Sequence, residues 1–135
     1  MTDAVTSYSL KKNERLKSRL TIQKLFTQGA SLFVFPLKLV YISVEDNKQT
    51  TDFLVGVTVP KRSHKKAHTR NLLKRRIREA YRKNKPTFAK QVDKPRRYAL
   101  MYILVDQNIT DYAQIEKSMI KLNKKLISKL CTAND

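Results

Sequence analysis

A basic segment at residues 61–83 constrains the possible fold more than any other part of the chain. It holds 11 of the 29 Lys and Arg residues and a single acid, Glu79. Successive residues of a helix lie about 100° apart, so a helix from about Lys66 to Lys83 would gather its apolar side chains on one face. Those side chains are Leu73, Ile77, Ala80 and Tyr81. The segment is therefore predicted to be a long helix with one side packed on the rest of the protein.

An adjoining side of this predicted helix carries dense positive charge. Its polar residues span an arc of roughly 140°; they are Arg70, Asn71, Lys74, Arg75, Arg78 and Arg82. Like charges four residues apart repel by about a few tenths of a kcal/mol, and a helix face that only meets water would carry acids to relieve this. The pattern favours an anion-binding surface over a solvated face, since Arg suits bidentate contacts with phosphate.

The residues just before the helix extend this positive surface. Lys61, Arg62, Lys65 and Lys66 precede its first turn, and backbone N–H groups at a helix start add to phosphate binding. The whole chain has a net charge of +18, and a polyanionic partner gives a reason for a compact domain to tolerate such self-repulsion. Nucleic acid is the leading candidate, because its phosphates release counterions on binding.

Length and apolar content indicate one folded domain, residues 1–135. A chain of 135 residues with 41% apolar residues suits one modest core but hardly two. Cys131 is the only cysteine, so no internal disulfide can form. The N-terminus lacks the apolar core of a signal peptide, and the longest apolar run, residues 98–105, is far shorter than the ~18 residues of a membrane helix. We therefore expect a cytoplasmic protein with no membrane partner.

The first part of the chain is predicted to form an arm, a helix and two strands. Residues 1–17 form a basic arm that we expect to be flexible. Ser18 caps and Gly29 ends a first helix. Strands are expected at residues 37–42, starting at Pro36, and at residues 53–59. A polar turn at residues 46–51 separates them.

The basic helix is followed by one more strand and one more helix. The strand spans residues 98–105 after a polar connection, and Thr110 or Asp111 caps the last helix. The buried stripe of that helix is Ile115, Met119, Leu122, Leu126 and Leu130. The predicted order is helix, two strands, helix, strand, helix. This order predicts an α/β (α+β) class, with a small central sheet and helices packed on it.

The ordered string on the basic helix resembles the signature of the bacterial ribonuclease P protein component. The string is Val59-Pro60-Lys61-Arg62, then Lys66-Ala67, then Arg70-Asn71-Leu72-Leu73-Lys74-Arg75-Arg76-Ile77-Arg78-Glu79-Ala80-Tyr81-Arg82. Earlier matches are Arg15-Leu16, Ile22-Gln23-Lys24-Leu25-Phe26, Gly29 and Gly56-Val57. Two positions depart from the family pattern. Leu72 replaces the usual second Arg of Arg-Asn-Arg, and residues 64–66 stand where a glycine is usual.

The resemblance implies a left-handed βαβ crossover and a protein that assists a catalytic RNA. In this family the RNA subunit carries the Mg²⁺ ions and the chemistry, and no organic cofactor is expected. The basic helix would dock on that RNA and help to remove the 5′ leader of precursor tRNA. The residues expected to contact the catalytic RNA are Lys66, Arg70, Asn71, Lys74, Arg75, Arg78 and Arg82.

The resemblance also implies a cleft between the first helix and the sheet that receives the single-stranded leader. Unpaired bases stack on aromatic rings with little sequence preference, which suits a subunit that accepts many leaders. The residues expected to bind the leader are Lys11, Lys12, Arg15, Ile22, Phe26, Tyr41, Lys61 and Arg62. Phe33 and Phe35 are weaker candidates, because aromatic residues at such spacings are more often part of a core.

Protein catalytic machinery is not evident in the sequence. A metal-dependent nuclease needs two or three convergent carboxylates, and the 11 acids fall mostly in predicted loops and chain ends. His64 and His68 have a spacing that can bind zinc on a helix, but no third ligand is near. We therefore expect no catalytic residue and no metal site in the protein. The main alternative is a ribosomal or ribosome-assembly protein that packs against RNA without a role in catalysis.

Overall fold

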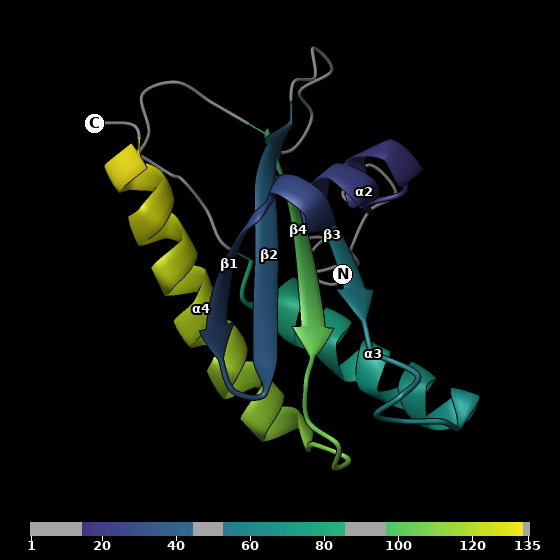
Figure 1. The fold of residues 1–135 in the computed structure, drawn as a ribbon. Coiled ribbons are helices and arrows are strands. Elements are labelled where there is room, and N and C mark those ends of the chain that lie inside the picture. The colour runs from purple at the N-terminus through teal and green to yellow at the C-terminus, as the bar shows by residue number, and fades with distance from the viewer. Residues whose placement is uncertain (1–14, 45–52, 86–96, 134–135) are drawn as a thin grey trace, which may run out of the picture.

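The computed structural model describes residues 15–44, 53–85 and 97–133 (Figure 1). The predicted turn at residues 46–51, Lys11 and Lys12 lie outside these ranges, as does most of the predicted connection before residue 97. The elements in chain order are α2 (Arg19–Gln28), β1 (Ala30–Val34), β2 (Leu37–Val44), β3 (Phe53–Thr58), α3 (Ala67–Lys83), β4 (Arg97–Leu104) and α4 (Tyr112–Ala133). The α+β class with a small sheet and packed helices is confirmed, and each predicted helix and strand is present.

The predicted order of elements was incomplete, because it omitted β1. This strand has only five residues and lies at one edge of the sheet. It pairs with β2 as an antiparallel hairpin, with Val34 opposite Leu37. Pro36 therefore lies in the turn between two strands, where its missing N–H removes no ladder bond. The strand expected after Pro36 is present as β2, and only the strand before the proline, β1, was not expected.

The sheet has four strands in the order β1-β2-β4-β3, with β3 and β4 parallel and the other pairs antiparallel. The parallel pair is joined through α3. In Figure 1 both of these strands point downward, β3 lies to the right of β4, and α3 lies behind the sheet. This connection is a left-handed crossover, which general statistics disfavour and which the family resemblance implied.

The two faces of the sheet pack against different helices. Leu37 and Leu39 of β2 belong to the main core, with the buried stripes of α3 and α4. Val40, the next residue along, belongs to a second cluster with Leu25 of α2. Because successive side chains of a strand point to opposite faces, α2 packs on the face opposite α3 and α4. We call the α2 side the open face.

The chain just before α2 is bound to the edge of β3. Leu16 donates its backbone N–H to the carbonyl of Val55 over 2.9 Å, and its side chain packs against the cluster beneath α2. A Cβ at Gly56 would lie 2.9 Å from the Met101 side chain and 3.6 Å from Cβ of Leu16. The predicted flexible arm at residues 1–17 therefore ends in a segment that belongs to the fold.

Both ends of α2 agree with the sequence prediction. The Ser18 hydroxyl accepts a hydrogen bond from the N–H of Thr21 over 3.3 Å. At the other end, Gly29 has φ −73° and ψ 154°, an extended conformation. Glycine is needed there for space, because a Cβ would clash with the carbonyl oxygen of Leu25. This tight exit leads the chain directly from α2 into β1.

Candidate nucleic-acid interface

The helix α3 separates its apolar and cationic sides as predicted. Its buried residues are Leu73, Ile77, Ala80 and Tyr81. Of the residues expected to contact the catalytic RNA, those exposed are Lys66, Asn71, Arg75 and Arg78, and those half-buried are Arg70, Lys74 and Arg82. None of the seven lies in either apolar cluster. Packing on the sheet therefore holds α3 rigidly while its charged side chains remain accessible.

The N-terminal end of α3 is also suited to anions. Lys66 is its N-cap residue, with no side-chain hydrogen bond to the cap, and the first turn holds no acid. Backbone N–H groups at a helix start carry partial positive charge and bind phosphate. Lys61, Arg62 and Lys65 are exposed just before this end. Positive side chains and helix N–H groups thus meet at one place.

Two arginines of the predicted site also make bonds within the protein. Arg70 donates through Nη1 to the carbonyl oxygens of His64, over 3.0 Å, and Lys65, over 2.8 Å. Arg82 forms an ion pair with Glu79, donating to its two carboxylate oxygens through Nε and Nη2. This hydrogen bond is the main reason why the pKa of Glu79 lies below its ordinary value. Contact with phosphate would compete with these bonds at Arg82.

Other cations of α3 remain without an acidic partner in the described part of the chain. The two ion pairs found there both use Glu79, with Arg82 and with Lys83. The Nζ atom of Lys83 lies 3.7 Å from the carboxylate. Lys74, Arg75 and Arg78 form no ion pair with the described residues. The middle of α3 therefore keeps most of its positive charge for an external anion.

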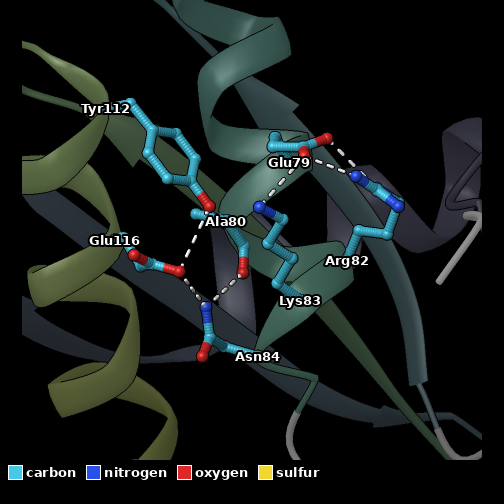
Figure 2. A network of polar contacts seen from close by, with 7 residues as sticks. All are labelled: Glu79, Ala80, Arg82, Lys83, Asn84, Tyr112 and Glu116. Atoms are coloured by element: carbon cyan, nitrogen blue, oxygen red, sulfur yellow. Dashed lines mark hydrogen bonds and ion pairs between the residues drawn. The ribbon is translucent and has the colours of Figure 1, made fainter.

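A polar network fixes the C-terminal end of α3 to α4 (Figure 2). The Asn84 side chain donates to the carbonyl of Ala80 over 2.9 Å and to the Glu116 carboxylate over 3.0 Å. The Tyr112 hydroxyl donates to the same carboxylate oxygen over 3.2 Å. Burial, followed by this bond to Glu116, raises the pKa of Tyr112 to about 12. Tyr112 therefore stays a neutral donor at neutral pH.

Arg76, which is not among the residues predicted to bind RNA, has a structural role. Its Nη1 donates to the carbonyl oxygen of Thr110 over 2.6 Å, in the connection between β4 and α4. Arg76 thus differs from Arg75 and Arg78, which are exposed. The sequence signal for this role was the position of Arg76 in the helix, one residue before Ile77 of the buried face.

The residues predicted for the leader cleft fall into separate places. Ile22 is half-buried against the cluster beneath α2, and Phe26, one turn later, is 54% exposed. Arg15 is exposed and forms a β-bridge with Val55 at the edge of β3. Lys61 and Arg62 are exposed in the turn that follows β3.

The prediction that Tyr41 lines the same cleft as Phe26 is wrong. Tyr41 has the same strand parity as Leu37 and Leu39, and it packs against the main core on the side of α3 and α4. Burial raises its pKa, with a smaller contribution from nearby Tyr98. The neighbouring position on the open face is Val40, which packs with Leu25.

Phe33, and not Tyr41, is the aromatic residue of the strands that lies on the open face. It pairs with Lys38, which pairs in turn with Ile103, so these side chains form a row across three strands on that face. Phe33 is 53% exposed, and its ring lies 6.4 Å from that of Phe35 in an edge-on arrangement. Such exposed rings beside a lysine are suited to stacking with bases. Once residues 30–34 are known to form a strand, the alternation of side chains along it assigns Phe33 to this face.

The described ranges contain neither a cluster of metal-binding side chains nor a membrane-spanning helix. Within residues 15–44, 53–85 and 97–133, no three His, Cys, Asp or Glu side chains gather as a metal site would require. None of the helices described there is both long and apolar enough to span a bilayer. His64 uses Nε2 in a 2.8 Å hydrogen bond with the carbonyl of Asp106, and His68 is exposed.

Comparisons with known sequences give the family of the chain. The family model described as Ribonuclease P matches residues 10–127. A ribonuclease P protein component from Porphyromonas gingivalis is 32% identical over 122 residues, which cover 90% of this chain and 88% of the relative. One from Petrotoga mobilis is 31% identical over 123 residues, covering 87% of this chain and 95% of the relative.

Solved structures agree at the level of the fold. The RNase P protein from Thermotoga maritima superposes with a TM-score of 0.61 at 23% identity, covering 83% of this chain and 96% of that one. The RNase P protein from Staphylococcus aureus gives a TM-score of 0.58 at 20% identity, covering 90% and 98%. The sequence matches and the shared fold show that this chain belongs to the ribonuclease P protein family, the protein component of the enzyme that processes the 5′ ends of tRNA.

Proposed function

We propose that the chain acts as the RNA-binding subunit of a ribonuclease P whose chemistry is carried by the RNA component. The observation that supports this most strongly is the cationic side of α3, which is held rigid by a buried apolar side and by the Asn84–Glu116 network. We assign the contact with the catalytic RNA to Lys66, Arg70, Asn71, Lys74, Arg75, Arg78 and Arg82. We also place this complex in the cytoplasm.

The geometry of α3 supports docking on RNA phosphates. Lys74 and Arg78 lie one helical turn apart, as do Arg78 and Arg82, so their heads follow the helix axis at about 6 Å intervals. Arginine can hold a phosphate through two N–H groups at once. Because the backbone of α3 is already ordered, binding requires only its side chains to become fixed, which keeps the entropic cost low.

The open face is the proposed site for the single-stranded leader of precursor tRNA. Ile22 and Phe26 of α2 form one side of it, and the row of Phe33, Lys38 and Ile103 extends it across the sheet. Aromatic rings offer stacking to any base, and cations attract the backbone. Arg15, Lys61 and Arg62 at the β3 edge and its following turn would hold leader phosphates.

In this proposal the Mg²⁺ ions are held mainly by the RNA subunit. The protein contributes positive charge that offsets repulsion between the phosphates of catalytic RNA and substrate. Mg²⁺ would otherwise have to screen that repulsion. The protein therefore acts on binding and assembly and supplies no reacting group.

Sequencing the RNA that co-purifies with the tagged protein from its own cells tests the proposal. The expected result is strong enrichment of one ribonuclease P RNA together with tRNA precursors. A variant with Lys74→Gln and Arg78→Gln should lose that enrichment. A variant with Lys125→Gln and Lys129→Gln on α4 removes the same charge elsewhere and should keep it. Enrichment of bulk ribosomal RNA alone would contradict the proposal and favour a ribosome-associated protein.

A further inference from the structure

We infer that His64 is a positioning residue, whose imidazole holds the basic turn at residues 61–66 in the form that meets RNA. The inference rests on the RNA-binding function proposed above and adds a residue that need not touch the RNA. The turn presents four exposed cations, which are Lys61, Arg62, Lys65 and Lys66. His64 lies among them and is only 6% exposed.

The buried imidazole connects the turn to a distant part of the chain. Its Nε2 lies 2.8 Å from the carbonyl oxygen of Asp106, which is 42 residues further along. A carbonyl can only accept, so Nε2 carries the hydrogen in this bond. On the other side of the turn, the N–H groups of Ser63 and His64 donate to the carbonyl of Pro60 over 3.1 and 3.2 Å. The turn is therefore closed locally and tethered by its histidine.

The anchor at Asp106 is itself fixed. Its carboxylate accepts a hydrogen bond from the N–H of Asn108 over 3.0 Å and from the Thr110 hydroxyl over 2.8 Å. The carbonyl of Thr110 accepts from Arg76 of α3 over 2.6 Å. The connection between β4 and α4 is thus bound to α3, and His64 binds the turn to that connection.

A second tether acts from α3 directly. Arg70 donates through one nitrogen to the carbonyls of His64 and Lys65. The backbone that carries Lys65 and Lys66 is therefore held from two directions, while their side chains remain exposed. A loop ordered before binding loses less conformational entropy when it meets its partner. His64 would in this way strengthen RNA binding through the neighbouring cations.

A second histidine of the same region offers a comparison with His64. His64 is 6% exposed and bonded to the carbonyl of Asp106, whereas His68, four residues later, is exposed. The chain thus offers a matched pair of histidines, one tethered and one in water. Replacing the first should affect the turn, and replacing the second should change little.

The first experiment compares substitutions at these two positions by RNA affinity. A transcript of the ribonuclease P RNA serves as the probe, and circular dichroism and thermal unfolding report the fold. His64→Leu should weaken RNA binding about three- to tenfold, the range for loss of one buried hydrogen bond. His64→Gln, whose amide can donate to the Asp106 carbonyl, should recover most of the affinity. His68→Leu should bind as the wild type does.

A double-mutant cycle tests whether His64 acts through the turn. In a Lys65→Gln/Lys66→Gln background, which removes the exposed cations beside the tethered backbone, His64→Leu should cause a much smaller further loss than in the wild type. In a Lys74→Gln/Arg78→Gln background, its full effect should remain. Additive losses in both backgrounds, or no recovery by His64→Gln, would overturn the positioning role.

Two further outcomes are distinguishable. Should His64→Leu fail to fold, Asp106→Ala loosens the same tether from its other end. The loss of RNA affinity in the Asp106→Ala variant must then also depend on the cations of the turn. If that loss does not depend on them, the inference is overturned. If the changes at Lys65/Lys66 and at Lys74/Arg78 all leave affinity for the ribonuclease P RNA intact, the proposed function itself fails. If those changes weaken binding and His64→Leu does not, the inference alone fails.

Discussion

The side chains of Phe33 and Tyr41 leave the sheet on opposite faces. The sequence showed that Leu37, Leu39 and Tyr41 share one side of their strand. It did not show which side meets α2, because Lys38, Val40 and Ile42 include apolar residues as well. Alternation gives relative positions within a strand, and only tertiary packing assigns each side to a helix. This is why Ile22 and Phe26 were placed on the correct helix while Tyr41 was assigned to the wrong face.

The aromatic residues of the open face give the first prediction. Phe26→Ala and Phe33→Ala should each weaken binding of leader-bearing precursor tRNA by about 1–3 kcal/mol, the value of stacking one base. Binding of mature tRNA should change much less. Tyr41→Ala is the matched control on the other face and should affect both RNAs alike. Equilibrium binding to the reconstituted complex measures this, and equal losses for both RNAs with Phe33→Ala would contradict a leader contact.

Glu79 gives a second prediction at the scale of a residue. The pKa of Glu79 is lowered chiefly by the hydrogen bond from Arg82. The contribution of this carboxylate to the stability of the fold is therefore complete above its ordinary pKa of 4.5. That contribution is lost as the pH falls through the lower pKa of the folded state. Because the pair is largely solvated, the contribution is small. Glu79→Gln should flatten the acid dependence of thermal stability in this range.

The same substitution should strengthen RNA binding at neutral pH. It removes the one negative charge on α3 and releases Arg82 and Lys83 from their ion pairs. Binding measured at two salt concentrations should show a tighter complex with a steeper salt dependence. An unchanged affinity would mean that this end of α3 does not meet RNA.

At the scale of elements, a strong periodic pattern was enough to predict a helix. A short strand at the edge of the sheet could not be predicted from its own residues. The buried residues of α3 share one face of a 17-residue helix, and the buried stripe of α4 runs from Ile115 to Leu130, so both helices were predicted. For α4 the predicted cap at Asp111 is also present, since its carboxylate accepts a hydrogen bond from the N–H of Gln114 over 2.9 Å. The strand β1 has five residues, of which three are exposed. A short edge strand gains its structure from the hairpin partner, and no local pattern in residues 30–34 was strong enough to reveal it.

The cap of α3 carries the prediction for this scale. Asn84→Ala removes two side-chain hydrogen bonds, to Ala80 and Glu116, and should lower the free energy of unfolding by about 1–3 kcal/mol. Asn71→Ala, at an exposed position of the same helix, should cost much less stability. Urea denaturation of both variants measures this. Equal stabilities would show that the network in Figure 2 does not hold the end of α3.

At the scale of the whole molecule, two candidate RNA surfaces belong to opposite sides of one sheet. The helix α3 packs on one face, and α2 packs on the other. A single rigid sheet can therefore set the distance and angle between a catalytic RNA and a leader. The strand order β1-β2-β4-β3 and the hand of the crossover depend on contacts between distant segments. Periodicity within each segment carries no information about them, and the family resemblance supplied the hand.

This arrangement predicts where the chemistry resides. In the proposed division of labour the RNA component holds the metal ions that cleavage requires, so the protein freed of RNA should not cleave precursor tRNA at any Mg²⁺ concentration. Adding ribonuclease P RNA should give cleavage at the 5′ end of the mature tRNA. The protein should lower the Mg²⁺ needed by that RNA, and this effect should shrink as monovalent salt rises, because salt screens the positive surface. Gel assays of cleavage across a Mg²⁺ series measure both effects. Correct cleavage by nuclease-treated, repurified protein would contradict the assignment of chemistry to the RNA.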